Sequence, residues 1–455
     1  MRKILIGAAI SFFAFSCSKK IDLLPSQSVE EGVALTSDAN VKKVLNGAYD
    51  AVSDGDLYGG DILLFSELLA ADGEIRWEGT FNEPDEAYGK SFLKTNSFVR
   101  DIWSSAYDAI NIANNVLSAI DVVNDADKDR VKGEAQFLRG AMYFELVKLF
   151  AQPYSAGSVS SNPGLPIVLT PTRGIDESSY VPRSTVEQTY AQILTDLTEA
   201  ENLLPAVNPG SNATTRMVFA TKAAAAAMLS RVYLQMENWN AAASAADRAI
   251  SVATANGRSL AADYAGAFNN TTNVPEYLFA MQISELDGAN NMHLYWSIPT
   301  YGGRDGDVAI LAKHLALYDA GDERLQLFYS GAGATRSGKW QQQYRNLPII
   351  RLAEMYLTRA EANFRAGTSV GDSPLDDVNL IRNRAGLVDL GAVTLADILK
   401  ERKLELAHEG HAVHDLKRLR LSADGFAYND NKMVLPIPQR EVDASRGIIE
   451  QNDGY

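Results

Sequence analysis

One short segment, residues 408–415, concentrates the residue types that could do catalytic or metal chemistry. It reads His408-Glu409-Gly410-His411-Ala412-Val413-His414-Asp415. Imidazole and carboxylate groups are the usual oxygen and nitrogen ligands of zinc. A zincin site needs two histidines four residues apart on one helical face, and that spacing is absent here. Gly410 is expected to end the helix and to scatter the side chains, so we predict no metal site, cofactor or catalytic residue.

Other enzyme motifs are missing from the sequence. There is no Gly-x-Ser-x-Gly elbow, no phosphate loop and no dinucleotide glycine fingerprint. The adjacent acids Glu30-Glu31 and Asp376-Asp377 point apart and carry little information about glycosidase chemistry. We therefore expect a protein that is not an enzyme, and a surface-anchored hydrolase using the histidines is kept as an alternative.

Tryptophans in loop-like segments are the better candidates for ligand contact. Three lie among glycine and polar residues, whereas Trp103 and Trp239 sit in helical patterns and are expected in the core. The C–H face of a sugar packs on an exposed indole while Arg, Asn and Asp take its hydroxyls. The predicted ligand-binding residues are Trp77, Trp296, Tyr301, Trp340, Arg76 and Arg304, with Asp72, Asn290 and Asn291 as polar companions. The alternative is that each loop tryptophan anchors its loop to the helices.

The elements that would position these residues are helices arranged in pairs. Residues 219–252 read FATKAAAAAMLSRVYLQMENWNAAASAADRAISV, two Ala-rich helical runs with a break at 237–240. With Tyr233 at the tyrosine position of a tetratricopeptide repeat, apolar or small residues fill the motif's other positions. These are Leu229, Ser230, Ala242, Ala246 and Ala249. One repeat cannot bury its own hydrophobic face, so neighbouring helix pairs are expected.

Similar periodicity elsewhere predicts the remaining helices. The segments are 41–49, 62–69, 98–120, 129–150, 184–204, 349–365, 373–384 and 394–408. Ser184, with Glu187 three residues on, predicts a capping box. Short extended segments are expected at 165–169, 277–283 and 433–438. The predicted fold is mostly α, a tetratricopeptide-like helix-pair superhelix packed against a loop-rich region with a few short strands.

The amino-acid composition limits the kinds of molecule that the protein is expected to bind. The chain has 455 residues, of which 46% are hydrophobic, enough for a large core. Lys and Arg total 42 against 57 Asp and Glu, which gives a net charge of −15. Nucleic-acid affinity comes mostly from Lys and Arg on phosphates, so we predict no nucleic-acid partner.

The N-terminus predicts export and a lipid anchor. Arg2 and Lys3 precede an apolar stretch, 4–15, that is too short to span a bilayer and is typical of a secretory signal. Cys17, the single cysteine, follows it and resembles the lipidated cysteine of a bacterial lipobox, although Ala14 replaces the usual leucine. The alternative is an ordinary signal peptide with an incidental cysteine.

These features define the expected domain boundaries. Residues 1–16 are the lipoprotein signal peptide, 17–39 the lipid-anchored tether and 40–455 a single domain. Within that domain we expect helical repeats at about 40–255 and 346–410, with a loop-rich insertion at about 256–345.

Taken in order, several blocks resemble the SusD/RagB-like outer-membrane lipoproteins of Bacteroidetes. The blocks are 134–144, 182–205, 220–250, Asp322-Glu323-Arg324, 351–362, Asn379 with Arg382, Arg384 and Gly386, 401–410, and Leu435-Pro436-Ile437-Pro438 followed by Glu441 and 451–455. The sequence departs from the family where His411 and His414 replace the usual arginine and aromatic residue.

The resemblance implies what composition does not show. Members of this family capture glycans, and in some cases peptides, at the cell surface. They deliver the ligand to a SusC-like TonB-dependent transporter in the outer membrane, without catalysis. We therefore predict capture of an oligosaccharide by a surface-exposed protein anchored through lipidated Cys17, with peptide capture as the alternative. A scaffold that binds protein on the concave side of the helices is a further alternative.

Overall fold

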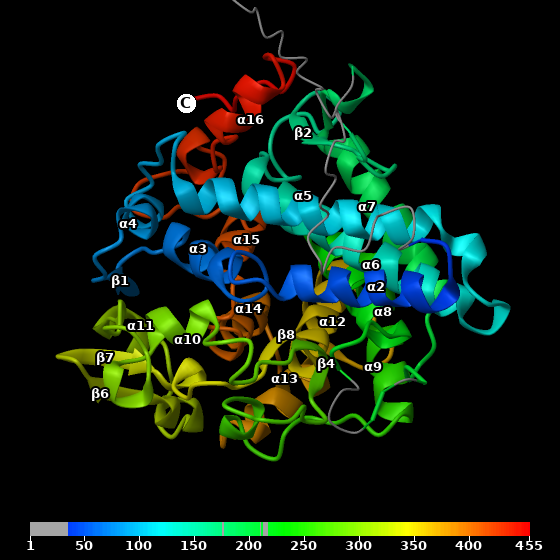
Figure 1. Cartoon of the computed structure of the whole chain (residues 1–455). Helices are drawn as coiled ribbons and strands as arrows, with labels where there is room; N and C mark the ends of the chain where they lie inside the picture. Colours follow the sequence, from blue (N-terminus) through cyan, green and yellow to red (C-terminus); the bar gives the residue numbers. More distant parts are fainter. Residues whose placement is uncertain (1–34, 175–176, 210, 213–216) are drawn as a thin grey trace, which may run out of the picture.

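The computed structural model describes residues 35–174, 177–209, 211–212 and 217–455 (Figure 1). The predicted signal peptide, Cys17 and most of the predicted tether lie outside these residues. Within them, helix α2 begins at Asp38, with Ser37 as its N-cap, so the folded body starts slightly before residue 40. None of the described helices has the length and apolar character needed to cross a membrane.

A continuous stack of helices forms one side of the molecule (Figure 1). In chain order, each helix packs against the next. The members are α2 (Asp38–Ser53), α5 (Ser97–Ser118), α6 (Asp125–Phe150), α7 (Val186–Leu203), α8 (Lys222–Gln235), α9 (Trp239–Ala255), α12 (Leu352–Ala366) and α13 (Pro374–Arg384). Helix α14 (Leu395–Glu405) packs on both α12 and α13. The predicted stack of helix pairs is confirmed.

The α8–α9 pair shows why these residues form helices. Ala223 is 5% exposed and Ala224 to Ala227 are fully buried, as are Ala242, Ala246 and Ala249 on the facing helix. Alanine has the highest helix propensity, and its small side chain lets two backbones approach closely. Glu237 has a φ of 57°, which turns the chain, and the Asn238 side chain accepts a hydrogen bond from the Ala241 N–H at 3.3 Å. The predicted break is confirmed at Glu237 and Asn238, whereas Trp239 and Asn240, also predicted in the break, already belong to α9.

The structure corrects three local predictions. The capping box of α7 uses Thr185 and Gln188 rather than Ser184 and Glu187, because Ser184 belongs to strand β3 (Arg183–Thr185), which pairs with β2 (Pro163–Pro166). Residues 349–351, predicted as helix, belong to strand β8 (Leu347–Arg351), which pairs with β4 (Tyr277–Met281). Helix α14 ends at Glu405, three residues before the predicted end.

A loop-rich region packs beside the stack at the lower left of Figure 1. Its antiparallel sheet has the order β1 (Ile75–Trp77), β5 (Val308–Ile310), β7 (Ala334–Ser337), β6 (Phe328–Gly331). Strand β1 comes from far outside the predicted insertion at 256–345, so the region combines distant parts of the chain. Around it lie α3 (Asp61–Leu69), α4 (Asn82–Tyr88), α10 (Asn291–Trp296), α11 (Ala312–Leu315) and α15 (Ala412–Arg418).

The C-terminal segment closes the fold. Met433, predicted as the first extended residue, ends a short 3-10 helix (Asn431–Met433), whereas Val434 has an extended backbone. The Leu435 N–H donates to the Leu149 carbonyl at 2.9 Å. Helix α16 (Gln439–Ala444) follows and lies above the N-terminal half of α5 (Figure 1).

Candidate functional site

The three loop tryptophans of the predicted binding site lie in the core. Trp77 is 6% exposed, Trp340 is 5% exposed and Trp296 is fully buried. Trp77 packs edge-on against Tyr295 with ring centroids 5.9 Å apart, and the Trp340 Nε1–H donates to the His408 carbonyl at 2.9 Å. A sugar cannot stack on an indole whose faces are covered by protein, so the prediction that these residues form a ligand platform is wrong. They anchor their loops, which was the alternative.

The two tryptophans in helices, Trp103 and Trp239, differ in burial. Trp103 is 2% exposed and belongs to the core, as predicted. Trp239 is only half-buried at the first turn of α9, where the Arg365 guanidinium lies 4.7 Å from its ring centroid. The prediction that Trp239 is a core residue is therefore wrong, because it lies at the solvent edge of its helix pair.

The other predicted residues remain at the surface. Tyr301 is 36% exposed and makes an edge contact with Tyr329, with centroids 5.6 Å apart. The Arg304 guanidinium lies over the ring of Phe81 at 4.1 Å from the centroid. Phe81 is itself 40% exposed, and sequence reasoning missed it. We call Phe81, Tyr301 and Arg304 the Phe81–Arg304 surface.

A glycine pair positions this surface. Gly302 has a φ of 86°, and a Cβ on Gly303 would lie 2.3 Å from the Ser297 carbonyl oxygen. Glycine is favoured at 302 by the left-handed backbone and at 303 by the close approach of the Ser297 carbonyl. The tight turn brings Arg304 back to donate to Asp307 at 2.9 Å and to the Thr80 hydroxyl, so its side chain is held against Phe81.

The predicted polar companions are already engaged. Arg76 is exposed and pairs with Glu78 through Nε at 3.1 Å, and Glu78 also pairs with Arg336 at 3.1 Å. Asp72 pairs with Lys313 at 2.7 Å. Asn290 caps α10, and the Asn291 amide donates to Asp61 at 2.8 Å. Arg76 therefore lies at the surface with a neighbouring carboxylate, and the two asparagines are structural.

The histidines of 408–414 point to different parts of the molecule. His408, with a φ of 64°, packs between Trp296 and His314 at centroid distances of 4.9 and 4.8 Å. His414 Nε2 lies 3.1 Å from the Ser66 hydroxyl. Burial lowers the pKa of His408, His411 and His414 well below that of an exposed imidazole. Among the described residues no group of three or more His, Cys, Asp or Glu side chains is arranged to hold a metal ion.

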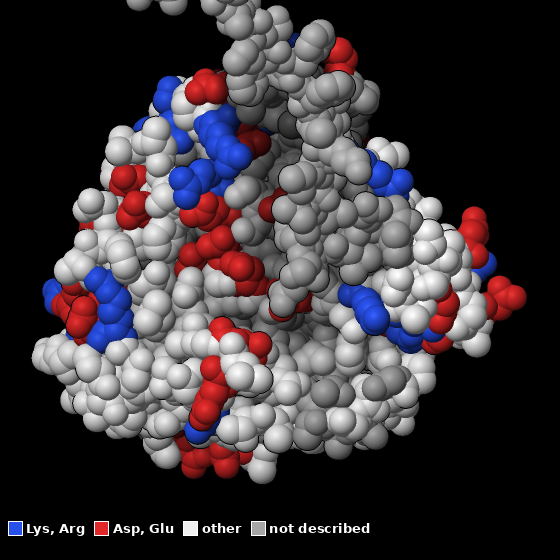
Figure 2. Space-filling view, viewed as in Figure 1, with Lys and Arg blue, Asp and Glu red and all other residues white. Residues whose placement is uncertain are grey.

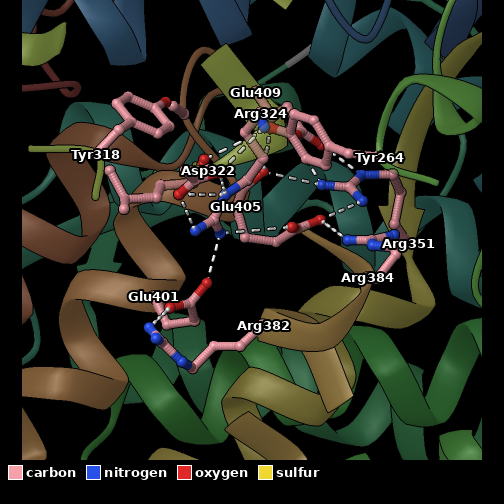
Figure 3. Close-up of polar contacts among 12 residues, drawn as sticks. Tyr264, Tyr318, Asp322, Arg324, Arg351, Arg382, Arg384, Glu401, Glu405 and Glu409 are labelled. Atoms are coloured by element: carbon pink, nitrogen blue, oxygen red, sulfur yellow. Dashed lines mark hydrogen bonds and ion pairs between the residues drawn. The ribbon is translucent and has the colours of Figure 1, made fainter. Parts of the chain in front are cut away.

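A buried network of charged side chains connects the helix stack to the loop-rich region (Figure 3). Arg351, at the end of β8, pairs with Glu276 at 2.5 Å, Glu405 at 2.8 Å and Glu409 at 2.7 Å. Arg324 pairs with Asp322 at 2.7 Å and with Glu401 at 2.5 Å. The full set holds five carboxylates and five cations, namely Glu276, Asp322, Glu401, Glu405, Glu409, Arg324, Lys339, Arg351, Arg382 and Arg384.

Electrostatics within this network are balanced. Burial alone would raise the pKa of Glu405, but Arg384, Arg351 and Arg324 outweigh it and hold that pKa well below its ordinary value. Burial lowers the pKa of Lys339 to about 8, with Glu409 opposing the shift. Buried charges are tolerated when they are paired and hydrogen-bonded. The network residues that come from the blocks at 322–324, 351–362, 379–386 and 401–410 therefore pair with one another in the interior and hold these elements together.

Together, the fold and surface define a class of protein: a helical-repeat scaffold that carries an exposed aromatic and guanidinium surface on its loops. Comparison of the sequence with models of known families agrees with this class. Residues 21–234 match the family described as "Starch-binding associating with outer membrane", and residues 324–433 match the "SusD family". The chain belongs to the SusD/RagB-like family, a family of glycan-binding proteins associated with the outer membrane.

Individual relatives support this assignment. The chain is similar to SusD-like protein P2 of Formosa agariphila, with 25% identity over 92% of each chain. It is 33% identical to the starch-binding protein SusD of Bacteroides thetaiotaomicron over 30% of this chain and 31% of that protein. A crystal structure of a SusD superfamily protein from B. thetaiotaomicron superposes with a TM-score of 0.78 at 25% identity, covering 91% of this chain and 99% of the other.

Proposed function

We propose that this protein captures an oligosaccharide at the cell surface and delivers it to a SusC-like TonB-dependent transporter, anchored in the outer membrane by lipidated Cys17. Family membership supports the class of function. The observation that carries the proposal is the exposed ring of Phe81 with Arg304 held over it at 4.1 Å.

The chemistry of the Phe81–Arg304 surface suits a sugar. The Arg304 guanidinium covers one face of the Phe81 ring, and the exposed parts of Phe81 and Tyr301 offer apolar area for the C–H face of a pyranose. The guanidinium of Arg304 has several fixed N–H donors for hydroxyl oxygens, and its side chain is 21% exposed. Arg76, on the edge strand β1, has a side chain that is 52% exposed and that already donates to Glu78 through Nε and one terminal nitrogen, which leaves its other N–H groups as further donors. These residues replace the three buried tryptophans as the proposed contacts.

Surface charge narrows the class of ligand. Figure 2 shows Asp and Glu side chains gathered across the middle of the face, between α5 and the loop-rich region. Asp54 and Asp101 lie close enough to Asp56 that their charges add to the effect of burial and raise its pKa. A polyanionic glycan would be repelled by such a face, so the proposed ligand is a neutral oligosaccharide.

A binding experiment tests the proposal. Soluble protein starting at Ser18 is titrated with neutral polysaccharides, sulfated polysaccharides and peptide mixtures, beside Phe81→Ala, Tyr301→Ala and Arg304→Ala. Loss of one stacking ring is expected to weaken glycan binding about tenfold. Phe364→Ala is the matched control, because Phe364 is 39% exposed but lies on α12 in the helix stack.

Each outcome has a consequence. A neutral glycan that binds the wild type and the Phe364→Ala protein, but not the three surface variants, supports the proposal and locates the site. Binding of peptides alone would make peptide capture the function. Glycan binding that is unchanged in all three variants would move the site to another part of the surface.

Anchoring and delivery need a cellular test. In the native host, Cys17→Ser is expected to abolish palmitate labelling and release the protein from the outer membrane, whereas Ser18→Ala keeps both. External protease should digest the anchored wild type on intact cells, and the protein should co-purify with a transporter of the SusC type. Protection from protease would place it on the periplasmic side and contradict surface capture.

A further inference from the structure

Helix α15 presents basic side chains to the interior where it packs against α3 (Figure 1). His411, His414 and Lys417 follow one another at intervals of three residues, so they lie on one side of this short helix. His414 is 4% exposed and Lys417 is 1% exposed, whereas His411 is half-buried at the start of the helix. A lysine is almost never fully buried unless it is paired. These side chains take no part in the Phe81–Arg304 surface or in the buried charge network.

The hydrogen bonds of His414 hold it as a neutral imidazole. The Ser66 hydroxyl on α3 donates its proton to the Ile62 carbonyl at 2.6 Å, so its oxygen can only accept from His414. His414 Nε2 lies 3.1 Å from that oxygen and therefore carries the ring proton. Within the described part of the chain, His414 Nδ1 is buried and has no hydrogen-bond partner. A second proton would have to bind at Nδ1, where its N–H would find no acceptor.

Lys417 is also held in its neutral form. Its Nζ donates to the Lys148 carbonyl at 3.2 Å, which is the one hydrogen bond of this amine among the described residues. An ammonium group has three N–H donors, so a charged Lys417 would leave two of them unsatisfied in the interior. Burial lowers the pKa of Lys417 to about 7, and the charge on Lys148 adds to this effect.

The charged groups of α6 and α8 that face these two bases are cations with partners of their own. Lys148 on α6 pairs with Glu145 at 2.8 Å, and Arg231 on α8 pairs with Glu354 at 2.7 Å. Burial and then nearby cations, these two among them, lower the pKa of the His414 imidazole well below that of an exposed one. A proton added to either base therefore enters a buried region that already carries positive charge.

The other charged groups around α15 come from α3, α12 and α14. Glu67 on α3 accepts hydrogen bonds from three backbone N–H groups at the start of α15. Asp415 pairs with Arg402 on α14 at 2.8 Å, and Arg418 pairs with Glu361 on α12 at 2.6 Å. Ion pairs thus anchor α15 to α12 and α14, whereas its contact with α3 includes two bases that must stay neutral.

Helix α3 connects this contact to the Phe81–Arg304 surface. Phe65, next to Ser66 on α3, stacks on Phe98 with ring centroids 5.8 Å apart, and the Phe98 ring lies 6.1 Å from that of Phe81. Helix α3 also packs against α4, whose N-cap is Phe81. A movement of α3 would therefore be transmitted to Phe81.

We propose that the contact between α3 and α15 is an acid-sensitive switch. It is closed while His414 and Lys417 are neutral, and mildly acid pH opens it by protonating them, which loosens α3 and the Phe81–Arg304 surface. The switch goes beyond the proposed function and does not depend on which molecule the protein captures.

The proton balance gives the direction of the pH effect. In the open form His414 regains the ordinary imidazole pKa near 6.5, so below about pH 6.5 the open form binds one more proton than the closed form. Lys417 acts in the same direction at higher pH, as the pH falls from 10.5 to about 7. His411, whose pKa burial lowers, and Glu67, whose pKa burial raises, have opposite signs and offset each other. The opening constant should therefore rise about tenfold between about pH 6.5 and 5.5.

Hydrogen exchange measured by mass spectrometry tests the opening. Protection factors, corrected for the pH dependence of chemical exchange, are compared at about pH 6.5 and 5.5 in the soluble protein starting at Ser18. Those of α3, α15 and residues 78–88 should fall about tenfold, whereas those of α8 and α9 should stay within about twofold. Unchanged protection of α3 and α15, or an equal fall in all helices, would overturn the proposal.

Variants of His414 assign the effect to its imidazole. His414→Gln keeps an N–H for Ser66 but cannot take up a proton, and His414→Phe keeps an aromatic ring. In both variants the protection of α3 and α15 should change by less than about twofold between about pH 6.5 and 5.5. A tenfold fall that persists in either variant would overturn the proposal.

Lys417→Met gives an independent test, because it keeps the length of the side chain and removes the amine. If the closed switch requires a neutral amine, this variant should protect α3 and α15 at least about tenfold better than the wild type at about pH 7.5. Lys43→Met, at an exposed position on α2, is the matched control and should leave their protection unchanged. Weaker protection in Lys417→Met would show that a charged Lys417 stabilises the contact and would contradict the proposal.

Discussion

A loop tryptophan can serve a protein by stacking on a ligand or by anchoring the loop, and the two uses require opposite exposure. Trp296 is fully buried and packs against His408, His408 packs in turn against His314, and the neighbouring Trp340 donates to the His408 carbonyl. These contacts join α10, α11 and the segment after α14. Trp296 therefore stabilises the loop-rich region that carries the exposed Phe81–Arg304 surface.

Replacing Trp296 tests the anchoring role. Trp296→Ala should lower the free energy of unfolding by about 3–5 kcal/mol, since a large buried side chain leaves a cavity. Urea denaturation followed by circular dichroism measures the change. Trp239→Ala, at a half-buried position, should cost clearly less. A Trp296→Ala protein of unchanged stability but reduced glycan binding would restore Trp296 as a ligand contact.

Glu67 provides a residue-scale test of pH dependence. Its carboxylate accepts hydrogen bonds from the N–H groups of Gly410, His411 and Ala412 at 2.8, 3.1 and 3.4 Å. Burial outweighs these contacts and raises its pKa to about 7. Because the pKa of Glu67 is higher in the folded protein than in the unfolded chain, protonated Glu67 stabilises the fold. This contribution is complete below the unfolded pKa near 4.5 and is lost as the pH rises through about 7.

The variant Glu67→Gln keeps an acceptor oxygen but cannot ionise. It should therefore remove part of the stability loss between pH 5 and pH 8, and at pH 8 it should be more stable than the wild type by up to about 3 kcal/mol. Chemical denaturation across this pH range measures the difference. Identical slopes for the two proteins would show that Glu67 does not titrate in this range.

At the scale of elements, the buried charge network determines how β8, α13 and α14 pack. Arg351 continues β8 and leads into α12, while Glu405 ends α14 and Arg384 ends α13. Their side chains meet in the interior (Figure 3). The hydrophobic pattern alone does not specify this arrangement, because the apolar faces of a short strand and two short helices could pack in several orders.

Arg351→Ala tests the network. It leaves Glu276 and Glu405 with Arg384 as their only shared arginine and Glu409 with Lys339, and it should cost about 3–5 kcal/mol of stability, as breaking a buried ion pair does. Arg351→Lys should also destabilise, because an ammonium group lacks the planar fork that reaches three carboxylates. Urea denaturation measures both. Arg248→Ala is the control. The Arg248 side chain pairs with Glu201 but is 46% exposed, so the loss of stability should stay below about 1 kcal/mol.

At the scale of the whole molecule, the helix stack and loop-rich region share one core. The main hydrophobic cluster runs from Val41 to Ile437 and includes side chains from α2, α6, α8, β4, β5 and β8. We propose on this basis that residues 40–455 form a single domain.

A single domain should unfold in one step. Scanning calorimetry of the soluble protein is expected to show one transition, with a calorimetric enthalpy equal to the van't Hoff enthalpy. Near-ultraviolet and far-ultraviolet circular dichroism should give the same midpoint. Two separated transitions, with the tryptophan signal of the loop-rich region lost first, would contradict a shared core.

Much of this architecture could be predicted from local sequence. Alanine-rich periodicity at 219–252 gave the α8–α9 pair, because helix propensity and small-residue spacing act within a few residues. The ordered blocks indicated the family. The errors came where a distant partner decides: Ser184 pairs with β2 and residues 349–351 pair with β4, so strand pairing overrode the local helical pattern.

Periodicity and motif order are properties of the chain, so they were enough to predict the long helices of the stack, their pairing and the family. They did not predict the short helices α4, α10, α11, α15 and α16. Which aromatic rings face solvent could be seen only in the folded protein. Loop residues have no periodicity that reports their exposure, which depends on contacts made hundreds of residues away. Those contacts buried Trp77, Trp296 and Trp340 and left Phe81, Tyr301 and Arg304 at the surface.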